Sequence, residues 1–320
     1  MGYKSRSIGV CVPAYNEASL VRATYEGIPK WIDYIALVDD ASTDETYEVM
    51  REIAKRDHRV SATQLPTNSG VGGAILSGHQ VLLSKGAEIF VVMAGDDQMD
   101  PASLPMLLDP IIEDRSDYVK GNRFSSFASV RSMPKIRVFG NLVLSFLSKF
   151  ATGLWHISDP QNGYTAIKVS LYKDLPVARI SQRFDFENDM LCWCRILEAR
   201  VLDVPIPARY KDEKSKLRII STAIVVFRTL VTSFMRRIWW NYLLWASSPA
   251  GLFLVLSSLF LTTSLGTGIW LTAVALGGST PSPATSLIPV GAGLIGLIFG
   301  LTFIVLDVVS CPKPTSRKYE

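Results

Sequence analysis

Three polar residues, Asp96, Asp97 and Gln98, follow closely after the apolar run that begins at Val91. An apolar run of this length predicts a buried strand, so these residues would lie at its carboxyl end. In open α/β sheets, ligands bind at that edge. Carboxylate and amide oxygens clustered there suit a hard divalent cation that carries a phosphate-bearing substrate. Residues 91–101 are therefore the predicted centre of a site.

Two further polar loops, at residues 13–17 and 39–44, follow other apolar runs, and residues 68–74 form a glycine-rich loop that opens a helix. Glycines at a helix start let backbone N–H groups approach a phosphate. Asp, Ser, Thr and Gly are also ordinary turn and cap residues, and Asp44 and Asp100 are predicted caps. Three such loops at one sheet edge favour a ligand site over capping alone.

The elements that must position these loops alternate in type along the chain. Short apolar runs predict strands, and the segments between them predict helices. This alternation implies right-handed crossovers and a mainly parallel α/β sheet. The predicted strands cover 8–12, 34–38, 59–64, 88–93 and 117–119, and the helices between the first four end near residues 30, 55 and 85.

The segments 12–17, 38–44, 68–74 and 96–101 resemble, in order and spacing, the successive signatures of family 2 glycosyltransferases. Within that family the sequence is most similar to the branch of dolichyl-phosphate mannose synthases and polyprenyl-phosphate glycosyltransferases. The resemblance implies a Rossmann-like head of the A-type glycosyltransferase fold, followed by interfacial helices and two C-terminal transmembrane helices.

The same resemblance implies where a nucleotide-sugar donor binds. Val71 departs from the family pattern, which often has lysine there, so one candidate cation is missing. The resemblance implies that Pro13, Tyr15 and Glu17 lie beside the nucleotide. It also implies that Asp39 and Asp40 lie at the base and ribose, with Gly70 and Gly72 near these two aspartates.

Asp96 and Gln98 match the family residues that hold a divalent metal, Mg²⁺ or Mn²⁺, together with the diphosphate. Ala94 stands where the metal motif usually begins with Asp. Asp97 occupies a position where glycine is common, and it is a candidate to restore the missing carboxylate. Because Mg²⁺ is typically held by one or two carboxylates plus phosphates and water, the loss of one ligand need not abolish binding.

Charged residues further along the chain are candidates for the acceptor side. Arg123 and Arg131 follow the fifth predicted strand, although exposed cations usually form solvated surface. Asp189, or the nearby Glu187, is a candidate to orient donor or acceptor, and helix capping explains either carboxylate equally well. Lys216 resembles a family residue that approaches the phosphates, and a basic linker beside a membrane explains it as well.

No charged residue and no histidine occurs between Ile238 and Leu306. This block has room for two membrane spans of about 20 apolar residues each, predicted at 249–271 and 287–309. Basic residues flank both spans, so the positive-inside rule predicts a cytoplasmic head. The expected divisions are a glycosyltransferase domain at 1–216, interfacial amphipathic helices at 217–245, a transmembrane hairpin at 246–310 and a cytoplasmic basic tail at 311–320.

The predicted reaction is the inverting transfer of a hexose from GDP-mannose or UDP-glucose to a polyprenyl phosphate at the cytoplasmic membrane face. Two alternatives stay open: transfer to a saccharide hydroxyl, which needs a base such as Asp189, and a non-catalytic membrane scaffold that binds nucleotide, which Ala94 favours. The net charge of +4 is small and dispersed and argues against a nucleic acid partner. The four cysteines lack disulfide-framework or zinc-site spacing and are predicted to be reduced thiols.

Overall fold

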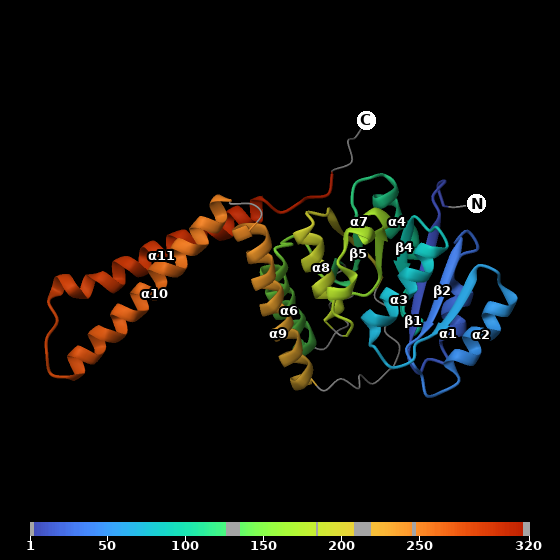
Figure 1. Cartoon of the computed structure of the whole chain (residues 1–320), viewed down its shortest axis with the longest axis horizontal. Coiled ribbons are helices and arrows are strands. Elements are labelled where there is room, and N and C mark those ends of the chain that lie inside the picture. The colour runs from blue at the N-terminus through green and yellow to red at the C-terminus, as the bar shows by residue number, and fades with distance from the viewer. Residues whose placement is uncertain (1–2, 126–134, 184, 208–218, 245–247, 316–320) are drawn as a thin grey trace. The chain divides into compact units, whose positions relative to one another are not determined.

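The computed structural model describes residues 3–125, 135–183, 185–207, 219–244 and 248–315 (Figure 1). The chain divides into two compact units. The first, called the head below, comprises Met1–Phe234 with Pro312–Glu320, and the second, the hairpin unit, comprises Met235–Cys311.

A seven-stranded sheet forms the centre of the described part of the head, in the order β3-β2-β1-β4-β6-β5-β7. The neighbouring strands pair in parallel, except that β6 runs antiparallel to both β4 and β5. The mainly parallel sheet and its first five strands are as predicted, whereas β6 and β7 are additional. The strands are β1 (Ile8–Ala14), β2 (Tyr34–Asp39), β3 (Val60–Gln64), β4 (Ile89–Val92), β5 (Tyr118–Asn122), β6 (Thr165–Lys168) and β7 (Val201–Pro205).

The register of the first strands brings the predicted site loops to one edge. Ala14 lies opposite Asp39 in the β1–β2 pair, and Cys11 lies opposite Val92 in the β1–β4 pair. Backbone hydrogen bonds extend both pairings, because the Asp40 N–H donates to the Ala14 carbonyl and the Gly95 N–H donates to the Pro13 carbonyl. The loops after β1, β2 and β4 therefore start side by side.

Helices cover both faces of the sheet because side chains along a strand alternate between faces. Val10 and Val12 pack on the face that also buries residues of α1, α2 and α4. Cys11 points to the other face, towards α3, where a Cβ on Gly78 would come within 2.2 Å of its Sγ. Glycine at position 78 therefore allows α3 to approach the sheet closely. The helices are α1 (Val21–Gly27), α2 (Thr46–Arg56), α3 (Val71–Ser84) and α4 (Leu104–Ile112).

The second half of the head adds helices that lie against one another rather than only on the sheet. The α6, α8 and α9 helices lie side by side (Figure 1). Phe150 of α6 stacks on Phe234 of α9 at 5.5 Å between ring centroids. The helices of this half are α6 (Lys135–Thr152), α7 (Val169–Asp174), which contacts β6, α8 (Phe186–Ile196) and α9 (Ile219–Ile238). The α9 helix continues into a π-helical segment at Trp239–Leu244.

Two long helices, α10 (Pro249–Leu276) and α11 (Pro283–Val309), pack along each other in the hairpin unit. Both are long and apolar enough to cross a membrane, and their most apolar windows are only 6% and 22% buried. Exposed apolar surface of this kind distinguishes them from the core helices of a soluble protein. Small and hydroxyl residues bring them close, since Ser257 donates to the Gly296 carbonyl at 2.8 Å and Ser264 donates to the Pro289 carbonyl at 2.7 Å.

A buried ion pair joins Arg237, which precedes α10, to Asp307 near the end of α11. Arg237 and Asp307 are each about 1% exposed, and their side chains lie 2.5 Å apart. The Tyr242 hydroxyl also donates to Asp307, and the Arg237 guanidinium lies over the Tyr242 ring. Asp307 therefore neutralises one of the basic residues that precede the first apolar helix.

Candidate active site

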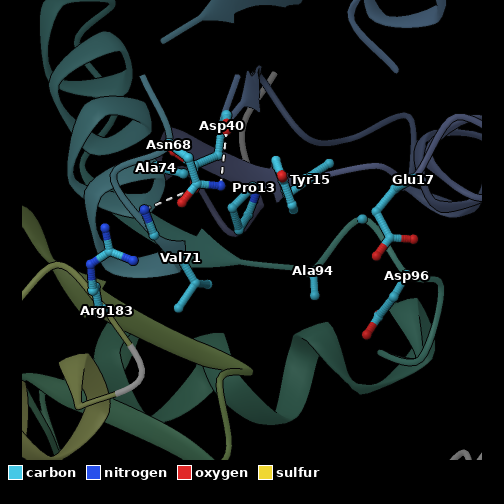
Figure 2. A pocket seen from close by; sticks show the side chains of 13 residues that line it. Pro13, Tyr15, Glu17, Asp40, Asn68, Val71, Ala74, Ala94, Asp96 and Arg183 are labelled. Carbon is cyan, nitrogen blue, oxygen red and sulfur yellow. Dashed lines mark hydrogen bonds between the residues drawn. The ribbon is translucent and has the colours of Figure 1, made fainter. Parts of the chain in front are cut away.

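A pocket of about 520 Å³ opens at the carboxyl edge of β1, β2 and β4 (Figure 2). Six of the residues predicted for the site line it, and they come from four different loops. The lining residues are Pro13, Ala14, Tyr15, Glu17, Asp40, Asn68, Gly70, Val71, Ala74, Ala94, Gly95, Asp96 and Arg183.

The loop after β1 is held by the loop after β2. Asn16 has a left-handed backbone with φ of 57°, and its side-chain oxygen accepts from the Thr43 N–H at 2.9 Å. The Glu17 N–H donates to the Thr46 hydroxyl at 2.9 Å. Asp44, a predicted cap, accepts from the Thr46 N–H at 3.0 Å, whereas the N-cap position of α2 is Glu45, whose side chain makes no capping bond. These bonds hold Tyr15 and Glu17 on the pocket wall.

The two neighbouring aspartates that end β2 have different surroundings. Asp40 lines the pocket, and its carboxylate accepts from the backbone N–H groups of Ser69 at 2.7 Å and Gly70 at 2.8 Å. Asp39 is fully buried and accepts from the Gln64 side chain at 3.0 Å and from the Ser42 N–H. Asp40 thus shapes the glycine-rich loop, whereas Asp39 braces the sheet edge and is not part of the pocket wall.

The glycine-rich loop uses its glycines in two ways. Gly70 lines the pocket with a φ of 88°, a conformation that favours glycine. Gly72 faces away from the pocket lining, because a Cβ there would meet the Phe186 ring at 2.7 Å. The Gly73 N–H donates to the Gln182 carbonyl at 3.0 Å. Gly70 therefore borders the ligand space, and Gly72 permits close packing against α8.

The loop after β4 presents Asp96 to the pocket. Asp96 Oδ1 accepts from the Gln98 N–H at 3.1 Å, which fixes the turn. Asp97 has a φ of 54°, and its N–H donates to the Thr24 hydroxyl at 3.1 Å. Neither Asp97 nor Gln98 is among the residues that line the pocket. Asp100 caps the following turn through the Ala102 N–H, as predicted.

The pocket has two ends of opposite character. Figure 2 shows Glu17 and Asp96 close together at one end, and Asn68, Val71 and Arg183 at the other. The carboxylates at the first end are hard oxygen donors of the kind that Mg²⁺ and Mn²⁺ prefer. Among the described residues no cluster of three or more His, Cys, Asp or Glu side chains could hold a metal alone. The donor set therefore fits a cation whose remaining ligands are phosphate oxygens and water.

Arg123, Glu187 and Asp189, the described residues among those predicted for the acceptor side, do not line the pocket. Arg123 forms a two-point ion pair with Asp159, at 2.8 and 3.0 Å, and Asp159 is buried. Asp189 is also buried and accepts from the Ser181 N–H at 2.9 Å. Arg131 and Lys216 lie outside the described residues, so their roles stay predictions.

One buried and two half-buried ionisable groups, Lys120, Glu187 and Asp203, interact electrostatically with the Arg123–Asp159 pair. The Lys120 ammonium is fully buried and donates to the Asn162 carbonyl, and burial lowers its pKa. Burial likewise raises the pKa of Glu187, against the opposing effect of Lys120. Burial raises the pKa of Asp203 to about 6. This part of the head therefore holds protons at carboxyl groups more readily than an exposed surface would.

Sequence reasoning missed Arg183 as a pocket residue. Gly70 and Arg183 are neighbours in space because a Cβ on Gly70 would lie 3.0 Å from Arg183 Cγ. No local pattern around Arg183 signals this proximity, since it depends on how the segment before α8 crosses the glycine-rich loop. Asn68 was predicted only as part of its loop, and its side chain donates to the Asp40 carbonyl at 3.3 Å.

Known proteins resemble this chain in sequence over most of the head. The model of glycosyl transferase family 2 matches residues 9–175. A UDP-N-acetylglucosamine–dolichyl-phosphate N-acetylglucosaminyltransferase of Methanococcus voltae is 29% identical over 218 residues, covering 64% of this chain and 86% of the relative. An undecaprenyl-phosphate mannosyltransferase of Micrococcus luteus is 28% identical, covering 61% of this chain and 80% of the relative.

Solved structures resemble the fold. A glucosyl-3-phosphoglycerate synthase of Mycobacterium tuberculosis, crystallised with Mn²⁺, UDP-glucose and phosphoglyceric acid, superposes with a TM-score of 0.54 at 20% identity, over 73% of this chain and 80% of that structure. The predicted A-type α/β fold is thereby confirmed. The family match covers more than half of the chain and includes every pocket-lining residue except Arg183. The chain therefore belongs to glycosyl transferase family 2 and is a glycosyltransferase.

Proposed function

We propose that this protein transfers a hexose, mannose or glucose, from a nucleoside diphosphate sugar to a polyprenyl phosphate at the cytoplasmic face of a membrane. The observation that carries this proposal is that the carboxylates of Glu17 and Asp96 lie close together at one end of the pocket in a family 2 chain. Two relatives named for dolichyl-phosphate and undecaprenyl-phosphate transfer support the acceptor class. The two apolar helices of the hairpin unit would keep the head close to a lipid acceptor.

The proposed mechanism is a single in-line displacement with inversion at the anomeric carbon. The acceptor phosphate oxygen forms the new bond as the bond from that carbon to the donor diphosphate breaks. Because a phosphate monoester is largely ionised near pH 7, with a second pKa of about 6, no strong general base is needed. His79 does not supply one, because it is buried against Phe90 and Tyr172, and burial lowers its pKa to about 3.

The residues of the pocket would bind and orient the donor. Asp96, with Glu17 beside it and Gln98 as a further candidate, would hold Mg²⁺ or Mn²⁺, which supplies charge neutralisation for the departing diphosphate. Tyr15 is 45% exposed on the wall and offers an aromatic surface to the nucleoside. Asp40 keeps the glycine-rich loop in place through two backbone N–H groups. Asp189, Arg123, Arg131 and Lys216 remain candidates for the acceptor side.

The proposed orientation follows from the charges around the hairpin unit. Arg236 precedes the first apolar helix, and Lys313, Arg317 and Lys318 follow the second. Arginine and lysine concentrate on the cytoplasmic side of membrane spans. The uncharged turn at 277–282 would then lie on the opposite side of the membrane from the head.

A donor screen tests the proposal. Membranes that contain the protein are incubated with purified polyprenyl phosphate and radiolabelled GDP-mannose, UDP-glucose or UDP-N-acetylglucosamine, with and without EDTA. We expect label in the lipid fraction with one hexose donor and its loss in EDTA. Label in a saccharide fraction would support transfer to a hydroxyl instead. Nucleotide binding without transfer to any acceptor would favour a scaffold and overturn the enzymatic proposal.

A further inference from the structure

The donor pocket has an unbalanced charge for a site that binds a diphosphate. Its lining includes three carboxylates, those of Glu17, Asp40 and Asp96, and one cationic side chain, that of Arg183. A nucleoside diphosphate is an anion, and charge-assisted hydrogen bonds to phosphate are among the strongest that a protein makes. Arg183 is therefore the described pocket residue best suited to bind the donor without a metal.

Arg183 is available for such a contact. Its side chain is exposed, and within the described part of the chain its guanidinium makes no hydrogen bond and no ion pair. Asp185, the nearest acidic residue along the chain, accepts instead from the hydroxyls of Ser181 and Thr229. The guanidinium thus keeps its donors for a ligand.

The backbone that carries Arg183 is held on two sides. On the pocket side, the Gln182 carbonyl accepts from the Gly73 N–H at 3.0 Å. On the other side, the Ser181 N–H donates to Asp189 at 2.9 Å, and Asp185 binds Thr229 of α9 at 2.9 Å. Arg183 therefore projects from a fixed segment and not from a free loop, which reduces the entropy lost when it binds a ligand.

The position of Arg183 coincides with a second electropositive feature. Arg183 packs against Gly70, the residue before the first turn of α3. The first N–H groups of a helix lack partners within the helix, and the helix dipole favours an anion there. Figure 2 shows Arg183 beside Val71 and away from Glu17 and Asp96. The two ends of the pocket would therefore hold a diphosphate by different means.

We propose that Arg183 binds the diphosphate of the donor directly, at the α3 end of the pocket and independently of the metal. This inference rests on the proposed function, because it assumes that a nucleoside diphosphate occupies the pocket. It gives the segment before α8 a role in donor binding. It also makes Arg183 the cation of a pocket in which Val71 supplies none.

Equilibrium titrations of the full-length protein with UDP and GDP test the proposal. Arg183→Ala should weaken binding of whichever diphosphate the wild type prefers by roughly 10- to 100-fold, the range expected for one charge-assisted hydrogen bond. The same ratio should persist in EDTA. Arg183→Lys keeps the charge but loses the planar guanidinium, so its affinity should lie between those of the wild type and Arg183→Ala. Arg179→Ala is the matched control, because Arg179 is exposed on the same segment and does not line the pocket.

A compensating variant separates a charge requirement from a structural effect. Val71 lines the same end of the pocket and is 37% exposed, so Val71→Lys in the Arg183→Ala background should recover at least part of the lost affinity. Unchanged binding in Arg183→Ala would overturn the inference while leaving the proposed function intact. A loss of affinity that appears only with metal present would also overturn it. Failure of the wild type to bind either diphosphate would instead count against the proposed function.

Discussion

Asp96 and Asp97 are adjacent in sequence, yet only Asp96 lines the pocket. We expect Asp96→Asn to lower the rate of sugar transfer by about 10²–10³-fold, the usual cost of losing one contact that stabilises developing charge. Asp97→Asn is the matched change, and Asn tolerates the positive φ at this position. It should keep most of the activity. Initial rates at saturating donor measure both variants, and full activity of Asp96→Asn would remove Asp96 from the proposed mechanism.

Two glycines with nearly the same φ allow the effect of backbone strain to be distinguished from the effect of a steric contact. Gly70 has a φ of 88° and Gly86 a φ of 85°. A Cβ on Gly70 would lie 2.6 Å from the Gln182 carbonyl, whereas a Cβ on Gly86 meets nothing within 4 Å. Both alanine variants should lose roughly 1 kcal/mol of stability through backbone strain. Gly70→Ala alone should also weaken nucleotide binding, which a thermal melt and a titration on each variant would show. Equal binding by both variants would mean that Gly70 does not shape the pocket.

At the level of single elements, β7 carries the clearest expected pH response. Asp203 lies in β7, one of its oxygens is buried without a hydrogen bond to any described residue, and its pKa is raised to about 6. Between about pH 4 and 6 the native state holds this proton and the unfolded state does not. The free energy of unfolding should therefore fall by about 1–3 kcal/mol as the pH rises through this range.

Asp203→Asn should remove that pH dependence, because an amide does not titrate. Denaturant unfolding of the wild type and the variant at several pH values from 4 to 7 would compare the slopes. Asp117→Asn is a useful comparison, since Arg200 lowers the pKa of Asp117 in spite of burial. Its wild-type carboxylate should contribute stability that is lost only as the pH falls below about 4, so between pH 4 and 7 Asp117→Asn should leave the slope unchanged. If the free energy of unfolding depends on pH equally in the wild type and in Asp203→Asn, Asp203 is not the group responsible for this pH dependence.

The elements that local pattern fixes were predictable from sequence. The strands β1, β2 and β4 and the two long helices are mainly apolar, and turn residues follow them. The strands β3 and β5 are less apolar, and their prediction also depended on the alternation of strands and helices. The four-residue strand β6 follows the Asn162-Gly163 turn, and nothing in its own residues indicates that it inserts antiparallel between β4 and β5. That placement depends on pairing partners that are distant in sequence, which local propensity does not specify.

The candidate site was predictable to the same extent. Glu17, Asp40 and Asp96 could be found because each follows a strand whose carboxyl end lies at the pocket. The sequence does not show which of Asp39 and Asp40 lines the pocket, because that depends on which side chain points into the sheet. Nor does it distinguish Arg123 from an ordinary surface cation, because its buried partner Asp159 is distant in sequence. The resemblance to a family identifies which positions belong to the site, whereas the contacts in the structure show whether each side chain lines the pocket or supports it.

At the level of the whole molecule, the proposed topology predicts which positions are accessible from each side of the membrane. Ser279, in the turn between α10 and α11, and Ser84, at the end of α3, are both exposed. A membrane-impermeant maleimide should label Ser279→Cys in sealed cells and Ser84→Cys only after permeabilisation. The four native cysteines are buried and provide a low background. The reverse labelling pattern would place the head outside the cytoplasm.

The ion pair between Arg237 and Asp307 should stabilise the hairpin unit. Asp307→Ala leaves the buried guanidinium without its carboxylate, and breaking one partner of such a pair costs about 3–5 kcal/mol. The paired change Arg237→Met with Asp307→Leu should cost less, because no buried charge remains. Thermal melts of the detergent-solubilised protein would rank the two. A single variant as stable as the wild type would show that the pair contributes little.

The same ion pair has a consequence for biosynthesis. Arg237 and Asp307 are 70 positions apart, so at usual rates of translation the arginine is synthesised roughly 4–14 s before its partner. During that interval Asp307 does not yet neutralise Arg237, and the positive charge ahead of the first apolar helix can help to orient insertion. Once α11 follows, Asp307 neutralises it. One arginine would thus act first as a topogenic signal and later as a structural residue, and a nascent chain truncated before Asp307 should insert in the same orientation yet fail to become resistant to protease.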